Sequence, residues 1–235
     1  MKLGKLYLIP TPISGTDLKE CLINKDIKIV KSLKRFIVET PKVARSYLTS
    51  LELKTPIQKI VMDIYDEHSK QEEIQDIIQP LLMGENMGLM TDAGTPCIAD
   101  PGEEIVLVCH RLGIDVIPMI GPSSIFLTLM ASGLNSESFS FNGYLSRKPH
   151  KRQNELERLE EIVMRTNVTQ IFMEAPYRNQ SLFEDILKLN SELFLTLGIK
   201  VNSLDEEILT MPISKWKERN KVLDKVPIIF IIGKQ

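Results

Sequence analysis

The chain has 235 residues, of which 43% are hydrophobic and 26% are charged, and its formal net charge is −2 at pH 7. This composition excludes a disordered chain, and the small net charge gives no global preference for nucleic acid, membranes or acidic ligands. No apolar run approaches the roughly 18 residues that cross a bilayer, and the apolar part of the N-terminus is too short for a secretory signal. The sequence predicts a cytoplasmic protein with one large domain or two small ones.

Cysteine and histidine residues are too scattered to suggest a metal site. The cysteines show no CxxC spacing, which is typical of reduced thiols, and the histidines are isolated from one another and from the cysteines. These residues are Cys21, Cys97, Cys109, His68, His110 and His150. We therefore expect no metal in this protein.

Strands alternate with helices through the first 120 residues. Apolar runs predict strands at 5–10 and 35–39, and Thr40 with Pro41 suits the cap and first turn of a following helix. The other predicted elements are a helix at 70–83, with a capping box at Ser69 and Glu72 and an end at Gly84, a helix at 103–112 that ends at Gly113, and a strand at 114–121. Because short loops join these elements, we expect βαβ units and a mainly parallel sheet.

The pattern changes near residue 120, where a small-residue apolar segment at 125–133 leads to a basic helix at 149–165. The later predicted elements are a strand at 168–175, a helix through 182–190, and strands near 193–200, 206–213 and 226–233. Several of these strands are close in sequence, so part of a second sheet is expected to be antiparallel. We favour two α/β domains that meet near residue 120 over a single mixed domain.

The segment GLMTDAGTPCIADPG (88–102) joins an apolar strand to the helix at 103–112 and contains three glycines and two prolines. Glycine lets backbone approach a ligand closely and proline fixes the path of the chain, so we expect a rigid loop that offers backbone groups to a ligand beyond the strand ends. The sequence contains neither a Walker A lysine nor GxGxxG here, so the ligand need not be a polyphosphate. A plain strand-to-helix connection capped by the aspartates explains the same composition.

Five segments form an ordered set over most of the chain. They are LYLIPTPI (6–13), GLMTDAGTPCIADPG (88–102), IPMIGPSS (117–124), FNGYLSRK (141–148) and IFMEAPYR (171–178). In this order and spacing they resemble the tetrapyrrole methylase superfamily of S-adenosylmethionine-dependent methyltransferases. Within it, the chain is similar to the bacterial enzymes that methylate a cytidine 2′-hydroxyl of small-subunit ribosomal RNA.

The resemblance implies an α/β protein of two domains, residues 1–120 with a mainly parallel sheet and residues 121–235 with a mixed sheet. It also implies a homodimer that holds S-adenosylmethionine in a cleft between the domains. Nine residues are implied in cofactor binding: Pro10 and Thr11 at one side, Gly94, Thr95 and Ile98 at the methionine part, Ser123 and Ser124 at the domain junction, and Met173 with Pro227 at the adenine. On a plainer interpretation the serines cap a helix and Met173 belongs to the core.

Methyl transfer from a sulfonium depends largely on alignment of donor and acceptor and needs no metal. A hydroxyl acceptor gains from a nearby base. Asp92 is the carboxylate nearest to the expected site, and Glu174 follows the strand at 168–175, so either could orient an acceptor. Alternatively, Asp92 hydrogen-bonds its own turn and Glu174 caps a helix.

A cluster of basic residues in the segment SRKPHKRQ (146–153) is the predicted substrate-binding surface. It consists of Arg147, Lys148, Lys151 and Arg152, four positive charges ahead of Glu155. Such a local patch neutralises phosphates and favours ribosomal RNA as the acceptor. A solvated helix face, or a site for the carboxylates of a tetrapyrrole, explains the same residues.

Three segments depart from the ribosomal RNA enzymes. Glu39-Thr40-Pro41-Lys42 stands where that group has Glu-Asp-Thr-Arg, Ile13-Ser14-Gly15 where it has Ile-Gly-Asn, and LGIKVNSLDEE (197–207) where it has Arg-Glu-Leu-Thr-Lys. Two of these changes remove Arg or Lys near the expected cleft. Three hypotheses therefore stay open: a methyltransferase of a ribose 2′-hydroxyl in RNA, a methyltransferase of a tetrapyrrole or another small molecule, and a homologue that has lost catalysis.

Overall fold

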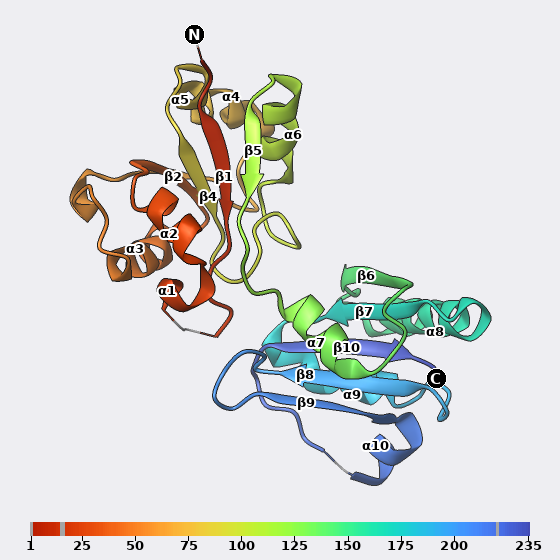
Figure 1. Ribbon diagram of the computed structural model, residues 1–235. Helices are drawn as coiled ribbons and strands as arrows, with labels where there is room; N and C mark the ends of the chain where they lie inside the picture. The colour runs from red at the N-terminus through yellow and green to blue at the C-terminus, as the bar shows by residue number, and fades with distance from the viewer. Residues whose placement is uncertain (1, 15–16, 220) are drawn as a thin grey trace. The chain divides into compact units, whose positions relative to one another are not determined.

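Alternating strands and helices build two α/β units in the computed structural model, which describes residues 2–14, 17–219 and 221–235 (Figure 1). Gly15, part of the departure at Ile13-Ser14-Gly15, lies outside the described residues. The chain divides into Met1–Ser123 and Ser124–Gln235, close to the boundary expected at residue 120. Each unit has its own sheet and its own core.

The first unit contains a five-stranded sheet in the order β3-β2-β4-β1-β5. All its strand pairs are parallel, so the predicted parallel sheet is confirmed. The strands are β1 (Lys5–Ile9), β2 (Arg35–Val38), β3 (Val61–Ile64), β4 (Met87–Met90) and β5 (Asp115–Pro118). The edge strand β3 was not predicted, because its residues are half-exposed and mix polar with apolar side chains.

Helices cover both faces of this sheet, which explains why the central strand β4 is buried along its whole length. One core lies between the sheet and α1 (Leu18–Cys21), α2 (Asn24–Val30) and α3 (Pro41–Ser50). The other lies beneath α4 (Ile74–Ile77), α5 (Gln79–Leu82) and α6 (Glu103–Arg111). Alternate residues of β2 serve the two cores: Phe36 and Val38 face the first, and Ile37 faces the second.

The predicted helix at 70–83 is wrong as a single element. The segment forms the 3₁₀ turn η2 (Gln71–Glu73), then α4 and α5, with the break just before Pro80, which lacks the N–H that a continuous helix needs. The capping box is wrong as well, because the Ser69 hydroxyl donates to Asp66 Oδ1 over 3.1 Å instead of capping a helix. The predicted end holds, since Gly84 follows α5 with φ +90°.

The second unit contains a mixed five-stranded sheet in the order β6-β7-β10-β8-β9. Its strands are β6 (Phe139–Tyr144), β7 (Thr169–Met173), β8 (Phe194–Ile199), β9 (Glu207–Pro212) and β10 (Ile228–Gly233). Only β6 and β7 pair in parallel among the strands described, and the later strands are antiparallel, as their short connections predicted.

Helix α7 (Ser124–Ser132) covers one face of the second sheet, and α8 (Pro149–Thr166), α9 (Asn179–Ile186) and α10 (Ile213–Arg219) cover the other. Helix α7 approaches β8 very closely, because a Cβ added at Gly198 would lie 2.3 Å from Thr128 Oγ1. No helix among the described residues is both long and apolar enough to cross a membrane.

Candidate active site

Two loops that follow neighbouring parallel strands are tied together at the carboxyl edge of the first sheet. After β1, Thr11 N donates to Gly94 O over 2.8 Å, and Gly94 N donates back to Thr11 O over 3.2 Å. A third loop joins them, since Thr95 Oγ1 donates to the carbonyl of Pro122 over 3.1 Å. Ligands of open α/β sheets bind beyond the carboxyl ends of the strands, so these three loops form the candidate ligand-binding edge.

The third loop packs against the first without room for a side chain. A Cβ added at Gly121 would lie 2.2 Å from Pro10 Cβ. Real Cβ atoms do not approach so closely, so the contact between Pro10 and position 121 requires glycine. The sequence motifs around residues 10, 94 and 121, although far apart in the chain, therefore make one structure within the first unit.

The loop after β4 has an unusual backbone. Gly94 and Gly102 have φ of +85° and +129°, and the non-glycine residues Cys97 and Ala99 have φ of 66° and 62°. A non-glycine residue in the left-handed region costs free energy and persists where the surroundings enforce it, often at ligand sites. Ile98, between the two, is exposed. The loop is thus shaped and held, as its glycines and prolines predicted.

Asp92 has a structural task at this edge. Its Oδ1 accepts from Thr40 N over 3.1 Å and its Oδ2 accepts from the Thr40 hydroxyl over 2.7 Å, while Tyr47 donates to its carbonyl. Thr40 precedes α3 as predicted, but its side chain makes no capping hydrogen bond to that helix and donates to Asp92 instead. Asp92 therefore ties the β4 loop to the start of α3, rather than bonding within its own turn.

Asp100 is a second carboxylate of this loop, and sequence reasoning did not single it out. Burial raises its pKa to about 6; a hydrogen bond from Thr91 opposes this shift, and the charges of Glu39 and Asp92 add to it. Glu39 Oε2 in turn accepts from the Thr91 hydroxyl over 3.2 Å. A carboxyl that is ionised only above about pH 6 and lies among other acidic side chains is suited to accept a proton near neutral pH.

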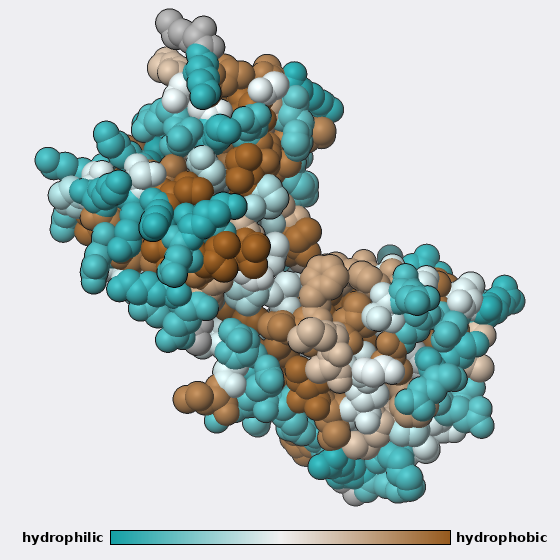
Figure 2. Space-filling model, in the orientation of Figure 1, coloured by the Kyte–Doolittle hydropathy of each residue, from teal (hydrophilic) through white to brown (hydrophobic). Residues whose placement is uncertain are grey.

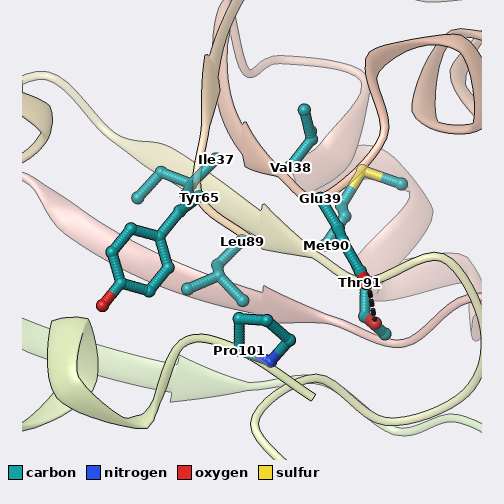
Figure 3. Close-up of a pocket in the computed structure, with 8 residues that line it drawn as sticks. All are labelled: Ile37, Val38, Glu39, Tyr65, Leu89, Met90, Thr91 and Pro101. Carbon is teal, nitrogen blue, oxygen red and sulfur yellow. Dashed lines mark hydrogen bonds between the residues drawn. The ribbon is translucent and has the colours of Figure 1, made fainter. Parts of the chain in front are cut away.

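A small cavity of about 10 Å³ adjoins Glu39 and Thr91 (Figure 3). Its lining consists of Ile37, Val38, Glu39, Tyr65, Leu89, Met90, Thr91 and Pro101. Figure 3 shows the hydrogen bond between Glu39 and Thr91 at one side of the cavity and the Tyr65 ring at the other. The space holds at most a single water, so the cavity is not the binding site for a larger ligand.

In the second unit, predicted site residues gather at the edge where β6 and β7 end. Met173 is the last residue of β7 and pairs in register with Ile229 of β10, two residues after Pro227. Glu174 follows directly, and its fully buried side chain accepts from Ala175 N over 2.7 Å and forms an ion pair with Arg178. Ser124 is the first residue of α7, and Ser123 is the last residue of the first unit, so the two serines belong to different units.

The prediction that Arg152 belongs to an exposed basic patch is wrong. Its side chain is only 2% exposed, and its Nε and Nη2 donate to Asp185 Oδ2 over 2.8 and 2.5 Å. Arg152 lies on the buried face of α8, and its charge is paired with Asp185 inside the second unit. Arg147, Lys148 and Lys151 are exposed and retain the patch with one charge fewer.

The chain superimposes on the crystal structure of the methyltransferase CobJ with a TM-score of 0.64 at 12% identity, covering 98% of this chain and 94% of that chain. This likeness confirms the predicted two-unit α/β fold.

The chain belongs to the family of tetrapyrrole (corrin/porphyrin) methylases, which it matches over residues 5–210. It is 31% identical to "Ribosomal RNA small subunit methyltransferase I" of Vibrio cholerae over 89% of this chain and 69% of that protein. It is 26% identical to the protein of the same name from Thermotoga maritima over 99% of this chain and 100% of that protein. The family and the methyltransferase class predicted from the five motifs are confirmed.

Proposed function

We propose that this methyltransferase uses S-adenosylmethionine to methylate a ribose 2′-hydroxyl of small-subunit ribosomal RNA, in the cytoplasm. The observation that carries the proposal is the pair of backbone hydrogen bonds between Thr11 and Gly94, which joins two family motifs into one ligand-binding edge. The name shared by the relatives of Vibrio cholerae and Thermotoga maritima supports RNA as the acceptor.

The residues at the carboxyl edge of the first sheet fit such a cofactor. The hydroxyl of Thr11 is buried and has no hydrogen-bond partner among the described residues, so a polar ligand group would satisfy it. Glu39, Asp92 and Asp100 make this edge negative, which suits a positively charged sulfonium. When bound, the cofactor supplies a methyl group on that sulfonium. The expected contributions of Ser124, Met173 and Pro227 from the second unit stay predictions.

Asp100 is our proposed proton acceptor. Burial raises the pKa of this carboxyl, and the charges of neighbouring Glu39 and Asp92 add to the shift, so that Asp100 is an effective base near neutral pH. A ribose hydroxyl whose proton passes to the Asp100 carboxylate becomes the better nucleophile. Asp92, bonded through both oxygens to Thr40, holds the loop in place. This assignment differs from the expectation that Asp92 or Glu174 orients the acceptor.

Cofactor binding is tested by thermal unfolding of the protein with and without S-adenosylmethionine. A ligand that binds only the folded state at 100 times its Kd stabilises it by about 2.7 kcal/mol, so we expect the melting temperature to rise by several degrees. The Gly121→Ala variant should lose this rise, because its new Cβ meets Pro10. An unchanged melting temperature of the native chain at saturating cofactor would favour a homologue that has lost catalysis.

A tetrapyrrole acceptor is the second candidate, since the family description names these compounds and exposed cations also suit carboxylate arms. Transfer of labelled methyl to small-subunit ribosomal RNA and to uroporphyrinogen, measured side by side, decides between them. Label in the RNA alone supports the proposal, and label in the macrocycle alone contradicts it.

We further infer that the protein forms a homodimer through α7. This helix buries Ile125 and Leu129 but leaves Phe126 59% and Met130 77% exposed, and the Phe126 ring packs edge-on against Phe139 at 6.0 Å. Figure 2 shows apolar surface gathered in this part of the second unit. Contiguous apolar surface of this kind is typical of a protein interface.

Replacing Met130 with glutamate should convert the dimer to a monomer, because a charge would be buried at the contact. Light scattering after size-exclusion chromatography measures the mass. Met83 is matched in exposure, at 74%, but belongs to the first unit and not to α7, so Met83→Glu should stay dimeric. A native chain that elutes as a monomer would contradict the inference.

A further inference from the structure

Two exposed tyrosines stand where the parallel strands β6 and β7 end. Tyr144 is the last residue of β6, pairs in register with Met173 of β7, and is 57% exposed. Tyr177 lies in the 3₁₀ turn η3 (Pro176–Arg178) that follows β7, and it is 66% exposed. The carboxyl ends of parallel neighbours share one edge of a sheet, so both rings belong to the same surface of the second unit.

The guanidinium of Arg178 is fixed beside these rings. It lies 5.1 Å from the centroid of the Tyr177 ring, and its Nη1 donates to the Tyr177 hydroxyl over 3.0 Å. Its Nη2 donates to the buried carboxylate of Glu174. The pKa of Arg178 is raised mainly by Glu174, and also by Tyr177 and Tyr144, so the hydroxyls of both tyrosines lie within electrostatic reach of this cation.

Glu174 holds Arg178 in place at a cost to stability. Its side chain is fully buried, and among the described residues neither its Oε2 nor the buried Nε of Arg178 has a hydrogen-bond partner. A buried ion pair with unsatisfied atoms is a weak source of stability, and an apolar pair would serve the fold at least as well. The pair does fix the plane of the guanidinium and the turn that carries Tyr177, which lowers the entropy cost of binding a ligand there.

The engaged atoms of Arg178 indicate which kind of contact is open to a ligand. Two of its in-plane nitrogens already donate, to Glu174 and to Tyr177, so it is poorly placed to grip a phosphate edge-on. Flat groups can still stack on the exposed tyrosine rings, while Arg178, whose side chain is only 16% exposed, supports the Tyr177 ring. Phosphate-binding charge is available nearby in the chain, because the exposed cations Arg147 and Lys148 follow Tyr144 after two intervening residues.

We propose that Tyr144, Tyr177 and Arg178 form a platform that stacks unpaired bases of single-stranded RNA, with Arg147, Lys148 and Lys151 neutralising the adjoining phosphates. The inference rests on the proposed function, since this RNA is the substrate, and it names the residues that recognise its unpaired state. Aromatic rings and arginine planes are the usual means by which proteins hold splayed-out bases without reading their sequence. Glu174 is then a positioning residue of the platform.

The platform is tested with a fluorescein-labelled ten-nucleotide single-stranded RNA and with the same strand lacking its central bases. Fluorescence anisotropy should show that Tyr177→Ala weakens binding of the intact strand by roughly tenfold or more and leaves the abasic strand unaffected. Tyr177→Phe keeps the ring and should retain most of the affinity. Lys151→Ala should weaken binding of both strands and lower the slope of affinity against salt by about one.

Equal weakening of both strands by Tyr177→Ala, no effect on either, or no RNA binding by the native chain would overturn the platform. So would a uroporphyrin whose binding, in place of that of RNA, depends on Tyr177. The melting temperature with S-adenosylmethionine is measured on the same proteins. A native chain that gains no stability from the cofactor refutes the proposed function, whereas a retained gain with base-independent RNA binding refutes only the platform.

Discussion

Replacing Asp100 with asparagine is expected to lower the rate of methyl transfer by about 10²–10⁴-fold, the usual contribution of a general base. Asparagine keeps the size of the side chain, but it cannot take a proton as the carboxylate does. Single-turnover transfer of labelled methyl to small-subunit RNA measures the rate, and the thermal shift with S-adenosylmethionine measures binding. If cofactor binding disappears together with the rate, Asp100 acts in binding and its assignment as the base is wrong.

The pH dependence gives a second readout of the same substitution. A base must be unprotonated, so the rate of the native protein should fall as the pH drops through about 6, the pKa of Asp100. The Asp100→Asn variant should show no such fall in this range. Asp115→Asn is a matched control, because Asp115 is exposed and begins β5 at the opposite edge of the sheet. A native profile that is flat between pH 5 and 7 would contradict the assignment.

The substitution that lowers the rate, Asp100→Asn, should raise the stability of the protein at alkaline pH. The pKa of Asp100 is about 6 in the folded chain against an ordinary value of 3.8, so the folded state gains stability from the protonated carboxyl below pH 3.8 and loses it as the pH rises through 6. At pH 8 the ionised carboxyl costs up to about 3 kcal/mol, less what partial exposure screens. Asp100→Asn should therefore melt at a higher temperature than the native protein at pH 8.

The features that the sequence predicted well depend on local patterns and on the geometry of parallel sheets. The glycines and prolines of the loop after β4 predicted a rigid loop. Parallel strands bring the loops that follow them to one edge of the sheet, which is why Thr11 and Gly94 meet. The prediction of one helix at 70–83 was wrong because it rested on the capping-box spacing of Ser69 and Glu72 and on Gly84, and did not take account of Pro80, whose missing N–H breaks the helix.

No comparable local pattern predicts the roles of two charged residues, Arg152 and Asp100. Arg152 is buried because Asp185 lies opposite it on α9, and the pairing of residues 33 positions apart depends on how two helices pack. Asp100 owes its raised pKa first to burial and then to Glu39, which comes from the loop after β2. The feature of the sequence that could have indicated a role for Asp100 is its position before Pro101, in a loop that was expected to bind a ligand.

Arg152→Ala removes a buried charge and should lower the free energy of unfolding of the second unit by about 3 kcal/mol, the lower end of the range for breaking a buried ion pair. Asp185 would be left with Lys188, which reaches its Oδ1 over 2.6 Å from a largely exposed position. Lys151→Ala, one residue away but exposed, should change stability by less than about 0.5 kcal/mol. Urea unfolding followed by tryptophan fluorescence measures both variants. Trp216 is the chain's single tryptophan and is buried in the second unit, where it packs against Phe183 of α9.

The pH dependence of this loss separates a charge effect from a packing effect. Burial alone would raise the pKa of Asp185, but hydrogen bonds from Lys188 and Arg152 hold it below its ordinary value of 3.8. The stability that the pair contributes is therefore present above pH 3.8 and lost as the pH falls through the lower pKa of the folded state. The difference between native protein and Arg152→Ala should shrink in acid, and replacing both Arg152 and Asp185 with leucine should recover most of the stability at pH 7. A loss that is independent of pH, or a double variant no better than Arg152→Ala, would mean that the aliphatic part of Arg152 stabilises the unit by packing and that its charge does not.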